Sequence, residues 1–209
     1  MQHKLSEFTD FLNVPLTLRS RVIVLLAALS LIPSFFLPLW RLNFWAQQYP
    51  EGLRLFIYAN KMVGGNHGND LKEINILNHY IGMAELREED FNEFKWIPLI
   101  IGLMIVLTLR AAVIGTLTSL VDIFVFMMYF GGFAMWRFWY MLYNYGHNLD
   151  PRAAVKVDPF TPPVFGKKMV GQFTVESFPS AGVLFFVLFA ALVLIGIYVT
   201  YREYKTDSQ

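Results

Sequence analysis

The chain has 209 residues, of which 56% are hydrophobic and 16% are charged, and its mean hydropathy is +0.44. Charged residues make up about 25% of a typical soluble domain, so this composition indicates a protein embedded in a lipid bilayer. The formal net charge of +1 excludes the strongly basic surface that nucleic-acid binding requires. The absence of cysteine excludes disulfides, thiolate metal ligands and iron–sulfur clusters.

The first apolar run, residues 22–39, predicts a membrane-spanning helix that is retained in the protein. Trp40, Arg41 and Trp45 follow it, which is typical of a headgroup boundary, and no small-residue cleavage site is present. The preceding residues 1–21 are either an amphipathic helix on the membrane surface or a frayed polar tail. The first alternative rests on apolar residues at helical spacing, namely Leu5, Phe8, Phe11 and Leu12.

Three further apolar runs predict three more spans. The apolar run from Trp96 through Leu109 is short for about 30 Å of hydrocarbon. We therefore expect the second span to continue through Arg110 to residue 113, with the Arg110 side chain extended to the interface. Gly115 then marks the reversal into the third span, residues 116–143, and residues 183–200 form the fourth. We therefore expect an all-α membrane protein with four transmembrane helices.

An even number of spans places both termini on one side of the membrane. Arg19 and Arg21 directly flank the first span, which favours cytoplasmic termini and periplasmic long loops in the cytoplasmic (inner) membrane. The expected organisation is a cytoplasmic segment (1–21), the first span (22–39), a folded extracytoplasmic loop domain (40–95), two spans (96–113 and 116–143), a Pro-rich extracytoplasmic loop (144–182), the last span (183–200) and a cytoplasmic tail (201–209).

Two charged residues are expected at membrane depth. Asp122 lies about two turns into the third span and Arg110 about one turn before the end of the second, so adjacent helices carry them at comparable depth. The pair is either a clasp between the helices or part of a proton- or quinone-linked site. Arg137 is expected at the opposite interface, where contact with aromatic side chains explains it without chemistry.

The loop of residues 40–95 is too long for a simple connection, so we expect it to fold. Residues 49–52 predict a turn and residues 53–58 a β-strand.

A helix is expected farther along this loop, beginning at Asn69 or Asp70, with Glu73 closing a capping box. Its apolar face consists of Leu71, Ile74, Leu77 and Ile81. Residues 78–83 form the densest cluster of side chains that could bind a ligand or partner. We expect Asn75, Asn78 and Tyr80 to contact a partner.

His79 and Met83 are four residues apart, which places an imidazole and a thioether on one helical face. Borderline and soft ligands of this kind suit copper. His67 from the glycine-rich loop and His147 from the end of the third span are the further ligands of this copper hypothesis. The alternative is that His79 belongs to a hydrogen-bonded network with the nearby asparagines and that Met83 only packs.

The second long loop, residues 144–182, is rich in proline and favours an extended path. Lys167 and Lys168 are expected to meet headgroups or an acidic partner, and Phe165 belongs to an apolar set beside them. This loop is either a docking surface or packs on the first loop.

Four strings in the chain resemble one protein family: YPEGL at 49–53, INILNHYIGM at 74–83, YGHNLDP at 145–151, and the diproline that leads to Phe165 and Gly166. The resemblance is to the NosB-like family of small membrane proteins that accompanies nitrous oxide reductase gene clusters, especially those of clade II. It covers roughly residues 18–200. It implies a role beside a copper enzyme that reduces nitrous oxide on the outer face of the cytoplasmic membrane.

Independent catalysis has little support, because the chain carries no dinucleotide-binding fingerprint, phosphate-binding loop, nucleophile elbow or HExxH motif. The leading hypothesis is an accessory subunit that docks periplasmic nitrous oxide reductase, or a related copper protein, near membrane electron-transfer proteins or maturation factors. Two alternatives remain: a copper-transfer protein that uses the loop His and Met residues, and a quinol or proton-relay subunit that uses Arg110 and Asp122.

Overall fold

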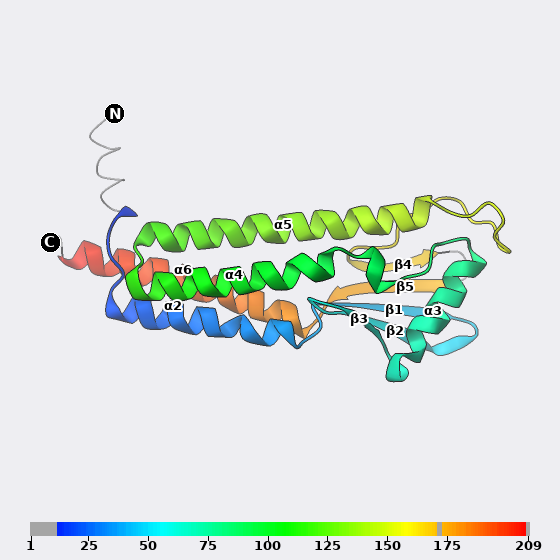
Figure 1. Cartoon of the computed structure of the whole chain (residues 1–209), viewed down its shortest axis with the longest axis horizontal. Coiled ribbons are helices and arrows are strands. Elements are labelled where there is room, and N and C mark those ends of the chain that lie inside the picture. Colours follow the sequence, from blue (N-terminus) through cyan, green and yellow to red (C-terminus); the bar gives the residue numbers. More distant parts are fainter. Residues whose placement is uncertain (1–11, 171–172, 208–209) are drawn as a thin grey trace, which may run out of the picture. The chain divides into compact units, whose positions relative to one another are not determined.

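The computed structural model describes residues 12–170 and 173–207, and these divide into two compact units (Figure 1). Within the described residues, the helical unit comprises 12–33, 99–131 and 184–207. The sheet unit comprises residues 34–98 and 132–183. The surface helix expected from Leu5, Phe8 and Phe11 lies outside the described residues.

Four helices are long and apolar enough to cross a membrane, which confirms the predicted set of four long apolar helices. They are α2 (Leu18–Ser30, continued by the 3-10 helix η1, Ile32–Phe35), α4 (Glu93–Ile114), α5 (Leu117–His147) and α6 (Ala181–Asp207). The helices α4, α5 and α6 each include nearly all of the predicted apolar run and extend beyond it. The first span differs, because α2 begins before residue 22 and the helical structure reaches Phe35 only through η1. The longest extension is at the end of α6, where residues 201–207, predicted as a tail, continue the helix.

Small and hydroxyl-bearing residues allow α2 and α6 to approach closely in the helical unit. The buried Thr200 hydroxyl donates to the Ser20 hydroxyl at 2.8 Å. A Cβ added to Gly196 would lie 3.2 Å from a methyl group of Val24. Side chains of this kind hold apolar helices together where burial against lipid gives little driving force.

The two long loops form one five-stranded antiparallel sheet, so the all-α prediction is wrong and the protein is mixed α and β. The strands are β1 (Trp40–Ala46), β2 (Tyr49–Ile57), β3 (Met62–Gly64), β4 (Gly166–Val170) and β5 (Phe173–Pro179), in the order β3-β2-β1-β5-β4. The physical reason is that backbone donors and acceptors in both loops need partners, and pairing across the loops supplies them.

The turn predicted at residues 49–52 is also wrong, because these residues belong to β2. The register between β1 and β2 shifts at Trp45, which frees its ring to cover Gly52. Gly52 has a φ of +80°, and a Cβ there would lie 2.7 Å from the indole nitrogen of Trp45. Glycine is therefore needed for a close approach inside a strand, and the chain reverses earlier.

The short helix α3 (Asn69–Tyr80) lies over β2 and β3 (Figure 1). Its predicted apolar face is confirmed, since Ile74 and Ile81 are buried in the core and the other two members pack against it.

The predicted capping box at the start of α3 is wrong. Gly68 is the N-cap, and the Asp70 carboxylate instead accepts a hydrogen bond from the Arg54 backbone N–H at 2.9 Å. Glu73 accepts a hydrogen bond from the Tyr49 hydroxyl, and this bond together with burial raises the pKa of Tyr49. Both carboxylates therefore fix the helix to β2 and do not close its first turn.

The second loop packs on the first. The Asp150 N–H donates to the Gly82 carbonyl at 2.8 Å, and the Val155 N–H donates to the Tyr80 carbonyl at 2.9 Å. Val170, Phe173 and Val175 enter the same core as α3. Intramolecular packing thus accounts for part of this loop, whereas Phe165 and Met169 remain exposed.

Gly146 gives a test of this packing. A Cβ there would lie 1.8 Å from the Phe160 carbonyl oxygen, so Gly146→Ala must displace the second loop. We expect the free energy of unfolding in detergent to fall by about 2 kcal/mol or more, as for overpacked cores. The matched control is Gly132→Ala on the same helix, where a Cβ meets nothing within 4 Å. That variant should be as stable as the parent or gain up to about 1 kcal/mol, and equal losses in both variants would refute the argument.

Candidate functional site

The free edge of the sheet is the first candidate binding surface. β4 pairs with β5 alone, so its other edge carries no strand within residues 12–170 and 173–207. Phe165 and Met169 are 67% and 71% exposed beside it, and Lys167 and Lys168 are exposed on the strand itself. We call Phe165, Lys167, Lys168 and Met169 the edge surface.

The polar contacts of the edge surface hold its two lysines in place. The Lys167 ammonium lies 3.1 Å from the Glu176 carboxylate and 5.1 Å from the centre of the Trp45 ring. The Lys168 ammonium donates to the Thr161 carbonyl at 3.1 Å. Of these two lysines, only Lys167 has a carboxylate partner in the described part of the chain. No ion pair therefore balances the positive charge of Lys168 there.

The opposite edge of the sheet is protected. β3 has three residues, and the Met62 N–H at its start donates to the Glu88 carboxylate at 3.1 Å. A Cβ on Gly64 would lie 2.4 Å from the Leu71 backbone nitrogen, so α3 covers the end of this strand. Unpaired strand edges invite further pairing, and here β4 offers the longer and less covered one.

The residues of the copper hypothesis fall in three places. His79 and Met83 line one surface cavity together with Asn148 and Asp150. His147 stacks on the Tyr143 ring at 3.8 Å, and its Nδ1 lies 2.9 Å from the Tyr143 carbonyl oxygen.

His67 precedes α3, whereas His79 lies in its last turn. At 1.5 Å per residue, the helix separates the two by roughly 15 Å, too far for one ion to bind both. The part of the chain that the structure describes contains no group of three or more His, Cys, Asp or Glu side chains suited to a metal. His79 and Met83 are therefore the pair that fits the hypothesis.

The three residues expected to contact a partner from α3 differ in exposure. Asn75 holds the Leu86 backbone through two hydrogen bonds, at 2.8 and 3.3 Å. Asn78 is 3% exposed, which removes it from any outer surface. Tyr80 is exposed at the end of the helix.

In the helical unit, Arg110 and Asp122 line one cavity with Ser119. This cavity has a volume of about 350 Å³. The two charged groups make no ion pair with each other in the described part of the chain. The structure thus brings the two residues to one cavity without the ion pair that the clasp alternative requires.

The sheet unit contains a second charged pair, of which the sequence analysis identified Arg137 but not its partner. Arg137 lies 5.7 Å from the centre of the Tyr140 ring, as expected, and its guanidinium also contacts Glu93 Oε1 at 2.5 and 2.7 Å. The Glu93 side chain is 12% exposed. A carboxylate at the first position of a long apolar helix was the available signal, because such a group needs a cation once it is buried.

No family model, no curated protein and no solved structure matches this chain.

The Glu93–Arg137 pair should contribute to stability because removing one partner leaves a largely buried charge. We expect Arg137→Gln to lower the free energy of unfolding in detergent by about 3 kcal/mol. The control is Arg87→Gln, which breaks an exposed ion pair to Asp90 and should cost less than about 1 kcal/mol. Similar values for the two variants would show that burial does not strengthen the Glu93–Arg137 contact.

Proposed function

We propose that this chain is a membrane-anchored docking protein, and that its edge surface binds an extracytoplasmic copper oxidoreductase. The observation that supports this most directly is the free edge of β4, with exposed Phe165 and Met169 beside lysines. The resemblance to proteins encoded with nitrous oxide reductase makes that enzyme the proposed partner. In this proposal the chain acts by binding and the chemistry belongs to the partner.

The physical basis of the binding is strand addition. An extended segment of the partner would pair its backbone with β4, which gives affinity, while side-chain contacts give specificity. Phe165 and Met169 supply apolar anchors, since large exposed apolar groups gain most from being covered. The charge of Lys168, which no ion pair balances in the described part of the chain, favours an acidic segment over a basic one.

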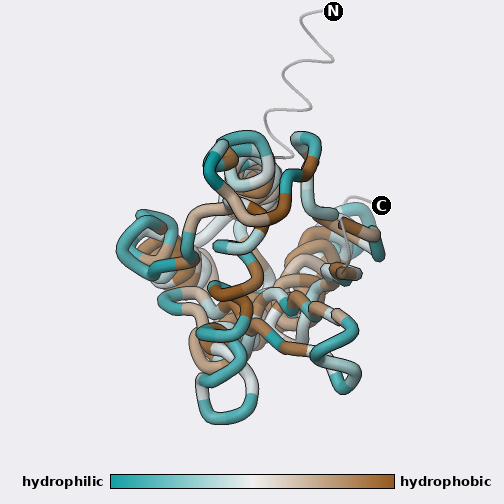
Figure 2. The backbone as a smooth tube through the Cα atoms, turned by 90° about the vertical axis from the view of Figure 1, so that its right-hand side faces the viewer, coloured by the Kyte–Doolittle hydropathy of each residue, from teal (hydrophilic) through white to brown (hydrophobic). Residues whose placement is uncertain are grey.

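The orientation in the membrane is part of the proposal. The loops that face the viewer in Figure 2 are predominantly hydrophilic, as expected for segments in water. With Arg19 and Arg21 beside the first span, we place the termini in the cytoplasm and the sheet unit outside. Anchoring then raises the effective concentration of the partner near membrane electron donors, without new chemistry in the anchor.

Copper transfer is the second candidate, because His79 and Met83 line one surface cavity. An imidazole and a thioether suit transient binding of Cu(I), which the chain would pass to the docked enzyme.

The docking proposal predicts that the chain and the reductase co-purify in mild detergent from native membranes that contain both. Met169→Glu places a charge on the edge surface, and we expect it to weaken the complex at least tenfold, as for an interface anchor. The control is Ile76→Glu, which changes a 49% exposed apolar residue on α3 and should leave co-purification intact. A parent chain that migrates alone, or a Met169→Glu variant that still binds normally, would count against the proposal.

The copper candidate predicts at least one ion per chain after purification with Cu(I), measured by metal analysis. His79→Ala should release this ion because the site loses its imidazole. His67→Ala is the matched control and should keep it, since α3 separates the two histidines. Protein without copper in this assay would end the copper candidate and leave the docking proposal untouched.

A further inference from the structure

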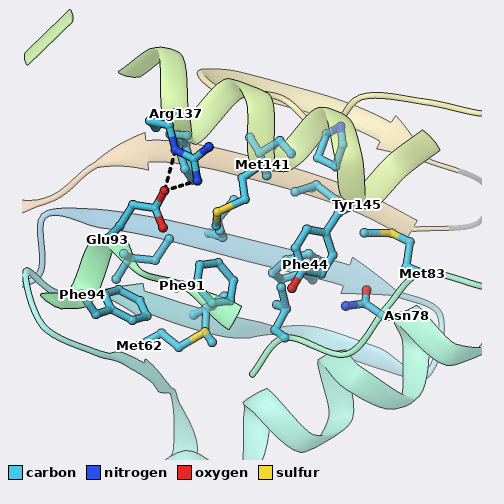
Figure 3. A pocket seen from close by; sticks show the side chains of 18 of the residues that line it. Phe44, Met62, Asn78, Met83, Phe91, Glu93, Phe94, Arg137, Met141 and Tyr145 are labelled. Carbon is cyan, nitrogen blue, oxygen red and sulfur yellow. Dashed lines mark hydrogen bonds and ion pairs between the residues drawn. The ribbon is translucent and has the colours of Figure 1, made fainter. Parts of the chain in front are cut away.

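The sheet unit contains an apolar cavity between the sheet, the first turns of α4 and the last turns of α5 (Figure 3). Its volume is about 140 Å³. The walls are mainly aromatic and thioether side chains, among them Phe44, Met62, Phe91, Phe94, Phe138 and Met141. Such walls suit a flat ring, because aromatic groups and sulfur both make favourable contacts with aromatic rings.

One end of the cavity carries an unused hydrogen-bond acceptor. Glu93 Oε1 receives Arg137, but Glu93 Oε2 is buried and has no hydrogen-bond partner among the residues that the structure describes. A buried acceptor of this kind is costly unless a donor reaches it. The charges of Glu93 and Arg137 balance each other, so the site favours a neutral molecule over an ion.

The other end carries a free amide. The Asn78 backbone carbonyl accepts from the Ile81 and Met83 N–H groups. Its side-chain amide lines the cavity, and the described residues show no hydrogen bond to it. Asn78 is 3% exposed, and its amide points into the cavity. Glu93 and Asn78 stand at opposite sides of the close-up, with Phe44 and Phe91 between them (Figure 3).

We propose that this cavity binds a single six-membered aromatic ring with a hydroxyl group at each end, the ring of a para-hydroquinone. The size supports one ring, since an apolar protein cavity of about 150 Å³ accommodates benzene. One hydroxyl donates to Glu93 Oε2, and the other exchanges a hydrogen bond with the Asn78 amide. This site is separate from the edge surface and does not depend on the docking proposal.

The ring has two sources, a water-soluble hydroquinone or the headgroup of a membrane-soluble quinol. Both present the same hydroxyl groups to Glu93 and Asn78. Competition by a decyl-substituted benzoquinol distinguishes them: displacement of bound hydroquinone identifies a site open to tailed quinols, and lack of displacement identifies a site for the free ring. Either result is compatible with the ring site itself.

The test uses the full chain in lipid nanodiscs, with empty nanodiscs as the reference, under anaerobic conditions. Binding of hydroquinone, phenol and benzene is measured by titration calorimetry. We expect hydroquinone to bind about fivefold or more tightly than phenol, and phenol to exceed benzene by a similar factor, because one hydroxyl satisfies the buried Glu93 Oε2 and the second gains a hydrogen bond with the Asn78 amide. No saturable binding, or equal affinities for the three rings, would overturn the proposal.

Variants locate the site. Asn78→Leu should reduce the affinity for hydroquinone to that for phenol while leaving phenol unchanged, a pattern that general misfolding does not produce. Asn43→Leu is the matched control, because it makes the same substitution at an asparagine that does not line the cavity. Ala134→Phe adds a ring to the cavity wall and should abolish binding of all three compounds. Unchanged binding in both Asn78→Leu and Ala134→Phe would place the ring elsewhere and refute the assignment, and the ranking in the parent chain remains decisive if these variants do not fold.

Discussion

The pairing of β1 with β5 is the interaction on which the sheet unit depends. It runs from Trp40 opposite Pro179 to Trp45 opposite Thr174, and it is the backbone contact that makes one sheet from two loops. The side chains reinforce it, since the Trp40 indole donates to the buried Ser177 hydroxyl at 2.7 Å and that hydroxyl donates to the Val164 carbonyl at 2.8 Å. Without this pairing, each loop would be left with a two- or three-stranded fragment and an uncovered apolar face, which is marginal in water.

The same sheet serves two proposed binding roles through different surfaces. Its free edge presents backbone groups and exposed apolar side chains, as a partner strand requires. Its inner face contributes Leu42 and Phe44 from β1 and Val175 from β5 to the wall of the cavity. Because one sheet supports both, the rigidity of the β1–β5 pair matters to each.

The sequence predicted the structure best where a helical repeat of apolar residues or a long apolar run determines it. The four apolar helices and the buried face of α3 followed from hydropathy and from 3.6-residue spacing. β1 did not, because its aromatic and basic residues are equally typical of a headgroup boundary. The pairing of β5 with β1 is non-local, so no signal in either segment alone specifies it.

Some residues of the candidate sites were also predicted from the sequence, and others were not. Phe165, Lys167 and Lys168 were identified as possible docking residues, and the structure exposes all three. Asn78 was expected to contact a partner because it lies outside the predicted apolar face of the helix, but the fold leaves it only 3% exposed. Glu93 was missed, since its cation lies 44 positions away on another helix. Contacts of this range depend on tertiary packing, which hydropathy patterns do not encode.

The chain order of the strands has a consequence for biosynthesis. β1 and β2 leave the ribosome more than a hundred residues before β5 does. At the usual rate of translation, the early hairpin waits on the order of ten seconds for its central partner, with its apolar face and one backbone edge uncovered. During that interval the nascent chain depends on chaperones or on the membrane surface to avoid aggregation, and premature termination before residue 173 would leave an early hairpin that quality-control proteases recognise.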